Sequence, residues 1–113
     1  MEIVEAISVD ELVEMSSKMS EPLVKGVVDI SQRILAVDTP LHTDAELLLL
    51  EHGSAQEDLW GINLWPEFFG TDDFVEFDSM INIRPMQNNR TRSVDNAQIR
   101  SCICEIIKEK VNG

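Results

Sequence analysis

The chain contains no tyrosine, few basic residues, and no continuous apolar stretch of the length that crosses a membrane. The lack of a run of about 18 apolar residues excludes a membrane-spanning helix. The first residues, MEIVEAISVDE, are acidic and lack the basic start and apolar core of a signal peptide, so we expect a cytoplasmic protein. Repeats, linkers and low-complexity segments are also absent, and the length of 113 residues then predicts a single domain over 1–113.

Side chains suited to catalysis or metal binding are few. Cys102 and Cys104 form an isolated C-x-C pair, without the second Cys or His pair of a metal site. His42 and Asp44 have the spacing of a metal pair, or of a general base with its orienting carboxylate, but no further ligands stand nearby. No Ser, Cys or Lys has the context of an activated nucleophile. We therefore expect no metal and no cofactor, and we favour a binding protein over an enzyme.

Basic residues number nine against 21 acidic ones, which gives a net charge of −12. A body of that charge repels phosphate, so non-specific binding to nucleic acid or to an anionic membrane is not expected. The charge is locally inverted between Asp78 and Asp95, where no acidic residue occurs and Arg84, Arg90 and Arg92 follow one another. A binding site for an anion would be expected there.

The pattern of apolar residues predicts a helix at each end of the chain. Residues 8–21 begin with Ser8 and Glu11, a capping-box pair, and Pro22 prevents the helix from continuing. Residues 95–111 repeat apolar side chains at helical spacing.

Between these helices, runs rich in β-branched residues predict antiparallel strands. The segments 23–30 and 33–38 read as a hairpin that turns at Ser31 and Gln32. Further strands are predicted over 58–65 and 74–84, the first ended by Pro66 and the second by Pro85.

Residues 41–53 fit two interpretations. Thr43 and Glu46 form a second capping-box pair, and four consecutive leucines favour a helix. The Gly53-Ser54 turn before the next strand instead favours a strand over 47–51, with or without one helical turn before it, and we prefer that interpretation. The predicted fold is α+β, with a four- to five-stranded antiparallel sheet and both terminal helices packed on one face.

The strand patterns also predict a polar outer face of the sheet. If Trp60, Ile62 and Leu64 face the core, Asn63 faces outward. Asparagine is depleted in strand interiors and its amide needs hydrogen-bond partners, which a ligand can supply. The candidate ligand-binding residues on this face and the adjoining loop are Asn63, Asn82, Arg84, Gln87, Asn89 and Arg90.

The arginines can instead neutralise the acidic surface of the chain itself. Arginine pairs with carboxylate or phosphate through a planar fork of donors, and it does so equally well inside one chain. The loop also lacks the Gly-rich cradle of a phosphate site. The carboxylates available as internal partners are Glu57, Asp58, Glu76 and Asp78.

Two blocks of the sequence carry a resemblance. The motifs GSxQEDLWGIN, from Gly53 to Asn63, and NIRPxQxNR, from Asn82 to Arg90, resemble a family of short prokaryotic proteins catalogued only as a domain of unknown function. The resemblance extends from about Leu23 onward. It implies no activity, substrate, cofactor or catalytic residue.

Three hypotheses about function follow. The first is a small binding domain that recognises an anionic small molecule, or an acidic segment of a partner protein, through the polar face and the loop 84–92. The second is a hydrolase-type enzyme acting on a phosphorylated or carboxylated substrate, with Glu57 or Asp58 as the base and His42 assisting. The third is a structural homo-oligomer without a ligand, assembled through exposed Trp65, Phe68, Phe69 or a free strand edge.

Overall fold

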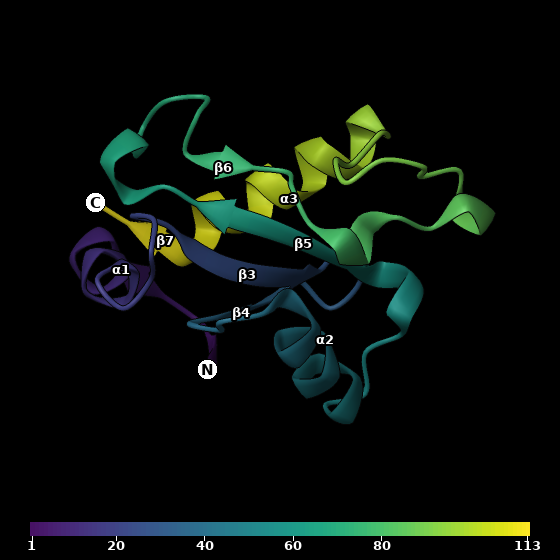
Figure 1. Cartoon of the computed structure of the whole chain (residues 1–113), viewed down its shortest axis with the longest axis horizontal. Helices are drawn as coiled ribbons and strands as arrows, with labels where there is room; N and C mark the ends of the chain where they lie inside the picture. The colour runs from purple at the N-terminus through teal and green to yellow at the C-terminus, as the bar shows by residue number, and fades with distance from the viewer.

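The structure, a computed structural model, describes all residues from Met1 to Gly113. Its centre is a five-stranded antiparallel sheet with the strand order β1-β4-β3-β5-β6 (Figure 1). The two longest strands, β3 and β5, pair along their whole length in the middle of the sheet. The five strands are β1 (Glu2–Val4), β3 (Val24–Asp29), β4 (Ile34–Val37), β5 (Leu59–Leu64) and β6 (Val75–Glu76).

Two helices, α1 (Val9–Ser16) and α3 (Ala97–Lys110), pack on the same face of the sheet (Figure 1). Leu12 of α1 and Ile103 of α3 are fully buried in one core with Trp60 of β5. A short parallel pair of strands, β2 (Ile7–Ser8) and β7 (Val111–Asn112), joins the start of α1 to the end of α3. The predicted α+β class, with both terminal helices on one face, is therefore confirmed. None of the helices is long and apolar enough to cross a membrane.

The third helix, α2 (His42–Glu51), lies on the opposite face of the sheet. Its buried residues Ala45 and Leu49 pack against Val27 and Leu59, which belong to a second, smaller core. The first residue of the helix, His42, stands over Ile62. The helix therefore covers one half of this face and leaves the half around Asn63 open.

The strand predicted over 47–51 is wrong, because these residues form the second half of α2. The helix turns Leu49 inward and leaves Leu47 more than half exposed, so the leucines do not all face a core. The predicted capping box at Thr43 does not form, since the helix begins after Leu41 without a side-chain cap. Packing of Leu49 on the sheet supplies the stability that the missing cap does not.

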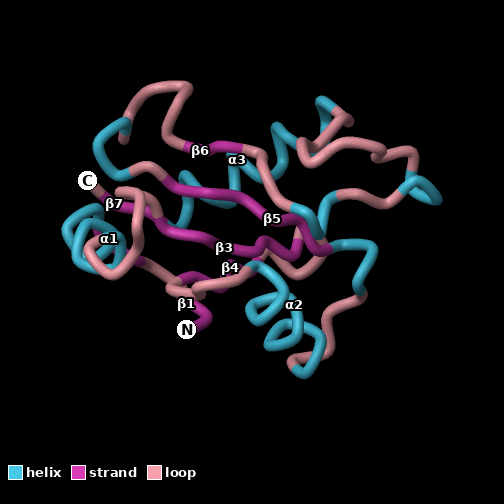
Figure 2. Tube along the Cα trace, viewed as in Figure 1, coloured by secondary structure: helices cyan, strands magenta, loops and turns pink.

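The strand predicted over 74–84 is much shorter in the structure. Only β6 pairs with β5, and the chain then follows single 3₁₀ turns at Met80–Asn82 and Pro85–Gln87 (Figure 2). The Ser79 hydroxyl accepts a hydrogen bond from the Ile81 backbone and so begins the first turn. The alternating pattern misled the prediction because Phe77 packs on the main core, whereas Ile81 packs on the smaller core of the opposite face.

The predicted first helix was also too long, since α1 ends at Ser16. The Ser16 hydroxyl donates to the carbonyl of Val13 at 2.7 Å, and the Ser17 hydroxyl donates to that of Glu14 at 2.6 Å. Serine hydroxyls compete with the backbone for these carbonyls and favour helix ends. The Ser8 and Glu11 capping box is present as predicted.

Candidate functional site

The outward-facing side of β5 carries the predicted polar residue Asn63. Trp60, Ile62 and Leu64 belong to the main core, and Gly61 and Asn63 lie on the other face, as the alternation predicts. Gly61 meets the first 3₁₀ turn so closely that an added Cβ would lie 2.5 Å from the Cβ of Ser79. Glycine is thus required there for the turn to close over the sheet.

Arg84 is held inside the protein rather than presented to solvent. Its guanidinium lies 4.1 Å from the centre of the Trp60 ring and donates at 2.5 Å to the carbonyls of Gln56 and Leu59. Burial lowers the pKa of Arg84, although a guanidinium remains charged at neutral pH. These contacts attach the loop to the start of β5.

The buried amides of Asn82 and Asn89 also connect the loop to the sheet. Asn82 accepts from the Gly61 N–H at 2.8 Å and donates at 3.0 Å to the carbonyls of Gly61 and Arg92. Asn89 donates at 2.7 Å to the carbonyls of Asn82 and Ser93. Both side chains therefore take the place of strand pairing and fix the position of Arg92.

The remaining predicted residues lie at the outer end of the loop or beside it. Gln87 donates to the Glu57 carbonyl at 3.0 Å. Arg90 is exposed, and its side chain contacts no carboxylate. Asp58 has a pKa that is raised by burial and by nearby carboxylates. None of these four residues lines the depression in which Asn63 lies.

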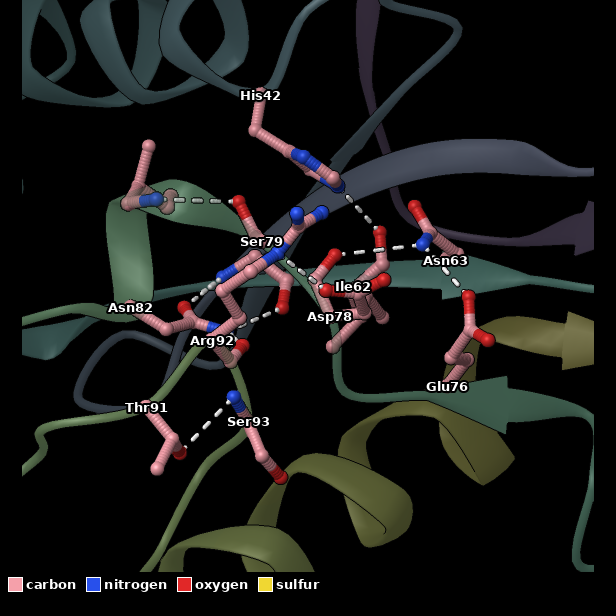
Figure 3. Close-up of polar contacts among 12 residues, drawn as sticks. His42, Ile62, Asn63, Glu76, Asp78, Ser79, Asn82, Thr91, Arg92 and Ser93 are labelled. Atoms are coloured by element: carbon pink, nitrogen blue, oxygen red, sulfur yellow. Dashed lines mark hydrogen bonds and ion pairs between the residues drawn. The ribbon is translucent and has the colours of Figure 1, made fainter.

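That depression lies on the half of the sheet face that α2 leaves open. It consists of two adjoining hollows of about 320 and 330 Å³. Lys25 on β3, Asn63 on β5, and Asp78 and Arg92 from the following loops line both hollows. His42 and Ser79 line the first hollow. Figure 3 shows His42, Asn63, Asp78, Ser79 and Arg92 gathered around the end of β5. We call the two hollows together the polar depression.

His42 reaches the sheet from the first turn of α2. Its Nε2 lies 2.8 Å from the carbonyl oxygen of Ile62. A carbonyl only accepts, so Nε2 carries the proton in this contact and Nδ1 of the neutral ring is left as an acceptor. Burial lowers the pKa of His42 below its ordinary value of 6.5, and the hydrogen bond to the Ile62 carbonyl and a weaker contact with the Asn63 side chain oppose this effect. The ring is therefore neutral at pH 7.

Asn63 forms the floor between the two hollows. Its side chain is 6% exposed, and its amide nitrogen donates to Glu76 Oε1 at 2.8 Å and to the Asp78 carbonyl at 3.3 Å. Glu76 also accepts from the indole N–H of Trp65 at 3.3 Å. The Oδ1 atom of Asn63 has no hydrogen-bond partner.

The two cations of the polar depression differ in their partners. Arg92 Nε lies 2.7 Å from Asp78 Oδ1, so this arginine pairs internally, as one of the two sequence interpretations predicted. Its two terminal nitrogens contact no other group of the protein. Lys25 is half-buried, and no carboxylate lies within 4.0 Å of its ammonium group.

Sequence reasoning found Asn63 but missed Lys25 as a member of the site. Lys25 stands alone between apolar residues of β3, and only its pairing opposite Asn63 brings it to the polar face. The signal was present in the sequence as a single charge within an apolar strand. It could not be assigned to a face without the strand register.

A larger hollow, of about 410 Å³, lies between the 69–75 loop and α3. Its walls are mainly apolar, with Phe69, Phe74 and Ile107 among them. Burial raises the pKa of the Cys104 thiol on its rim, so the thiolate is disfavoured there. Few polar groups converge in this hollow, and we therefore place the candidate site in the polar depression.

Comparison with known proteins identifies a family without assigned activity. Residues 1–110 match a family described as "Protein of unknown function (DUF5674)", which extends the resemblance over the N-terminal strand and helix. No curated protein and no solved structure matches the chain. Since the match covers 110 of the 113 residues, the chain belongs to this family of proteins of unknown function.

Proposed function

We propose that the protein is a small-molecule-binding domain whose polar depression holds an anion, either a carboxylate or a phosphate. The observation that carries the proposal is Lys25, a half-buried residue of the depression whose ammonium no carboxylate of this chain approaches within 4.0 Å. The chain has 21 acidic residues that could have paired with it. A lysine whose stem is partly buried and whose ammonium has no internal carboxylate partner is free to pair with a bound anion.

Arg92 adds a second cation to the same depression. Its Nε is engaged by Asp78, and this contact orients the terminal nitrogens without using them. The backbone carbonyl of Arg92 is also held by the Ser79 N–H and the Asn82 amide, each at 3.0 Å. The Arg92 side chain is 56% exposed, so its terminal nitrogens are accessible to a carboxylate or phosphate. Asn82 therefore supports the site by positioning Arg92.

The shape of the depression favours a small molecule over an acidic protein segment. Its two hollows, of about 320 and 330 Å³, are at the lower end of the size of ordinary ligand sites. Both are concave and share the same four polar residues, so one compact ligand could contact Lys25 and Arg92 together. An extended acidic segment would need further cations along the surface, and of the remaining arginines only Arg90 is free on this loop.

A thermal-shift screen with phosphate, nucleotides and small carboxylates tests the proposal. A ligand at one hundred times its dissociation constant stabilises the folded state by about 2.7 kcal/mol, which raises the melting temperature measurably. We expect at least one anion to stabilise the wild type, and the shift to be lost in Lys25→Gln. Lys108→Gln removes the same charge from the exposed surface of α3 and serves as the matched control. Equal shifts in both variants would show that the anion binds elsewhere.

A further inference from the structure

Two hydrogen-bond acceptors of the polar depression lack donors. The first is Oδ1 of Asn63, which belongs to a side chain that is 94% buried and has no partner. The orientation of this amide is determined, because the other end donates to the oxygens of Glu76 and Asp78, and reversing it would place oxygen against oxygen. Figure 3 shows Oδ1 on the side of the amide that points away from Glu76.

The second acceptor is Nδ1 of His42. The Nε2 atom of this ring donates its proton to the Ile62 carbonyl, and no group of the protein donates to Nδ1, which is accessible to solvent, whereas Asn63 Oδ1 is buried. Both residues line the same hollow. Buried acceptors normally have donors, and one that lacks a donor in the free protein is a place where a ligand donor fits.

Lys25 lies beside Asn63. The two residues are direct cross-strand partners on the same face of β3 and β5, so their side chains lie next to each other. Oδ1 of Asn63 is closed to solvent in the structure. An anion held by the flexible Lys25 side chain would therefore stand next to Asn63.

We infer that the ligand is a small anion that also carries an O–H or N–H donor, which is the chemistry of hydroxycarboxylates, amino acids and hydroxyalkyl phosphates. The inference rests on the proposed function, because Lys25 and Arg92 must first hold the anionic group. The donor then bonds to Asn63 Oδ1, with His42 Nδ1 as a second acceptor in the same hollow. A simple anion of equal size leaves both acceptors without a donor.

Isothermal titration with matched pairs of probes tests this inference. L-malate and succinate differ by one hydroxyl, and so do 3-hydroxypropyl phosphate and propyl phosphate. We expect the hydroxyl-bearing member of at least one pair to bind about tenfold more tightly, the effect of one well-formed buried hydrogen bond. The advantage should fall to about onefold in Asn63→Leu.

A second variant keeps the test valid if Asn63→Leu does not fold. His42→Phe removes the other acceptor and leaves the contacts of Asn63 with Glu76 and Asp78 intact, so it should reduce the advantage without abolishing anion binding. Equal affinity within both pairs, with binding still lost in Lys25→Gln, would overturn the inference and leave the proposed function standing. If none of the four probes binds the wild type, the inference is overturned, and the proposed function falls with it only if no anion of the thermal-shift screen binds either.

Discussion

Arg84 and Arg90 lie on the same loop in opposite environments. Arg84 stacks on Trp60 and donates to two backbone carbonyls, whereas Arg90 is exposed and its side chain has no partner. A stacked and partly buried guanidinium stabilises the fold, and an exposed one contributes little.

Replacing each arginine by methionine makes this contrast measurable. Arg84→Met leaves the Leu59 carbonyl without its donor and removes the stacked cation, so we expect the free energy of unfolding to fall by about 2 kcal/mol or more. Arg90→Met makes the same chemical change and should alter it by less than about 0.5 kcal/mol. Urea denaturation of both variants measures the difference, and equal losses would contradict the internal role of Arg84.

His42 predicts a pH dependence of stability. Its pKa is lowered in the folded state, mainly by burial, so as the pH falls the unfolded chain takes up the proton first. The contribution of His42 is therefore fully present above the unfolded pKa of about 6.5 and is lost as the pH falls from there toward the folded pKa. One histidine adds a slope of at most about 1.4 kcal/mol per pH unit in that window.

Denaturation of the wild type, His42→Gln and His52→Gln at about pH 7.5 and 5.5 separates this effect from that of the carboxylates. The His42→Gln variant should lose less stability on acidification than the wild type. His52 is exposed, and its variant should follow the wild type. The same pH response in all three proteins would show that His42 is not buried as a neutral ring.

Among single residues, Asn63 could be assigned to the correct face from the sequence, whereas Arg84 could not be assigned to an internal role. Alternation along β5 was enough to place Asn63, because its neighbours Ile62 and Leu64 both enter the main core. The internal role of Arg84 depends on the backbone between Ser79 and Asn89, which folds into turns that no local sequence pattern specifies. The functional role of the candidate residues in this loop stays a prediction.

At the level of elements, the two predicted capping boxes had different outcomes. The Ser8 hydroxyl accepts from the Glu11 N–H at 3.1 Å, and Glu11 Oε1 accepts from the Ser8 N–H at 3.3 Å. At α2 the helix begins one residue before Thr43, at His42, so the Thr43 hydroxyl caps nothing. The connection from β4 into α2 determines where the helix starts. The capping-box pattern of Thr43 and Glu46 does not determine it.

Alanine substitution at the two positions tests this distinction. Ser8→Ala should lower the free energy of unfolding by about 1 kcal/mol, because an N-terminal backbone N–H of α1 loses its acceptor. Thr43→Ala should change it by less than about 0.5 kcal/mol, since Thr43 is exposed and makes no cap. Chemical denaturation measures both values. A loss at Thr43 as large as that at Ser8 would mean that Thr43 also caps its helix.

Most helices and most strands of the five-stranded sheet were recognisable from the sequence; the exceptions were the short edge strand β1 and the helix α2. The hairpin of β3 and β4, the strand β5 and the helix α3 follow clear periodicity. The strand β1 was missed because it contains three residues. The second half of α2 was predicted as a strand over 47–51 because the Gly53-Ser54 turn suggested a hairpin, and the exposure of Leu47 shows that the leucines form no single apolar stripe. Short edges and helices with scattered apolar residues receive their structure from the sheet that they cover.

On the scale of the whole molecule, the polar depression exists because α2 covers only part of its face of the sheet. The sheet has helices on both faces, but α2 begins at His42 and runs away from the strand ends that carry Lys25 and Asn63. Those ends carry polar side chains where a fully covered sheet would carry apolar ones. The lining of the depression holds two cations, Lys25 and Arg92, together with the carboxylates Glu21, Glu76 and Asp78. We interpret this combination as a binding site built by the fold.

Nuclear magnetic resonance titration of the ¹⁵N-labelled protein with L-malate and with inorganic phosphate tests whether the polar depression binds an anion. We expect at least one probe to produce saturable shifts of the Asn63 side-chain amide and the Arg92 Nε–H, and Lys25→Gln to weaken this binding about tenfold or more. Shifts that are largest at Arg90, or the absence of saturable shifts with both probes, would contradict the assignment of the polar depression as an anion-binding site.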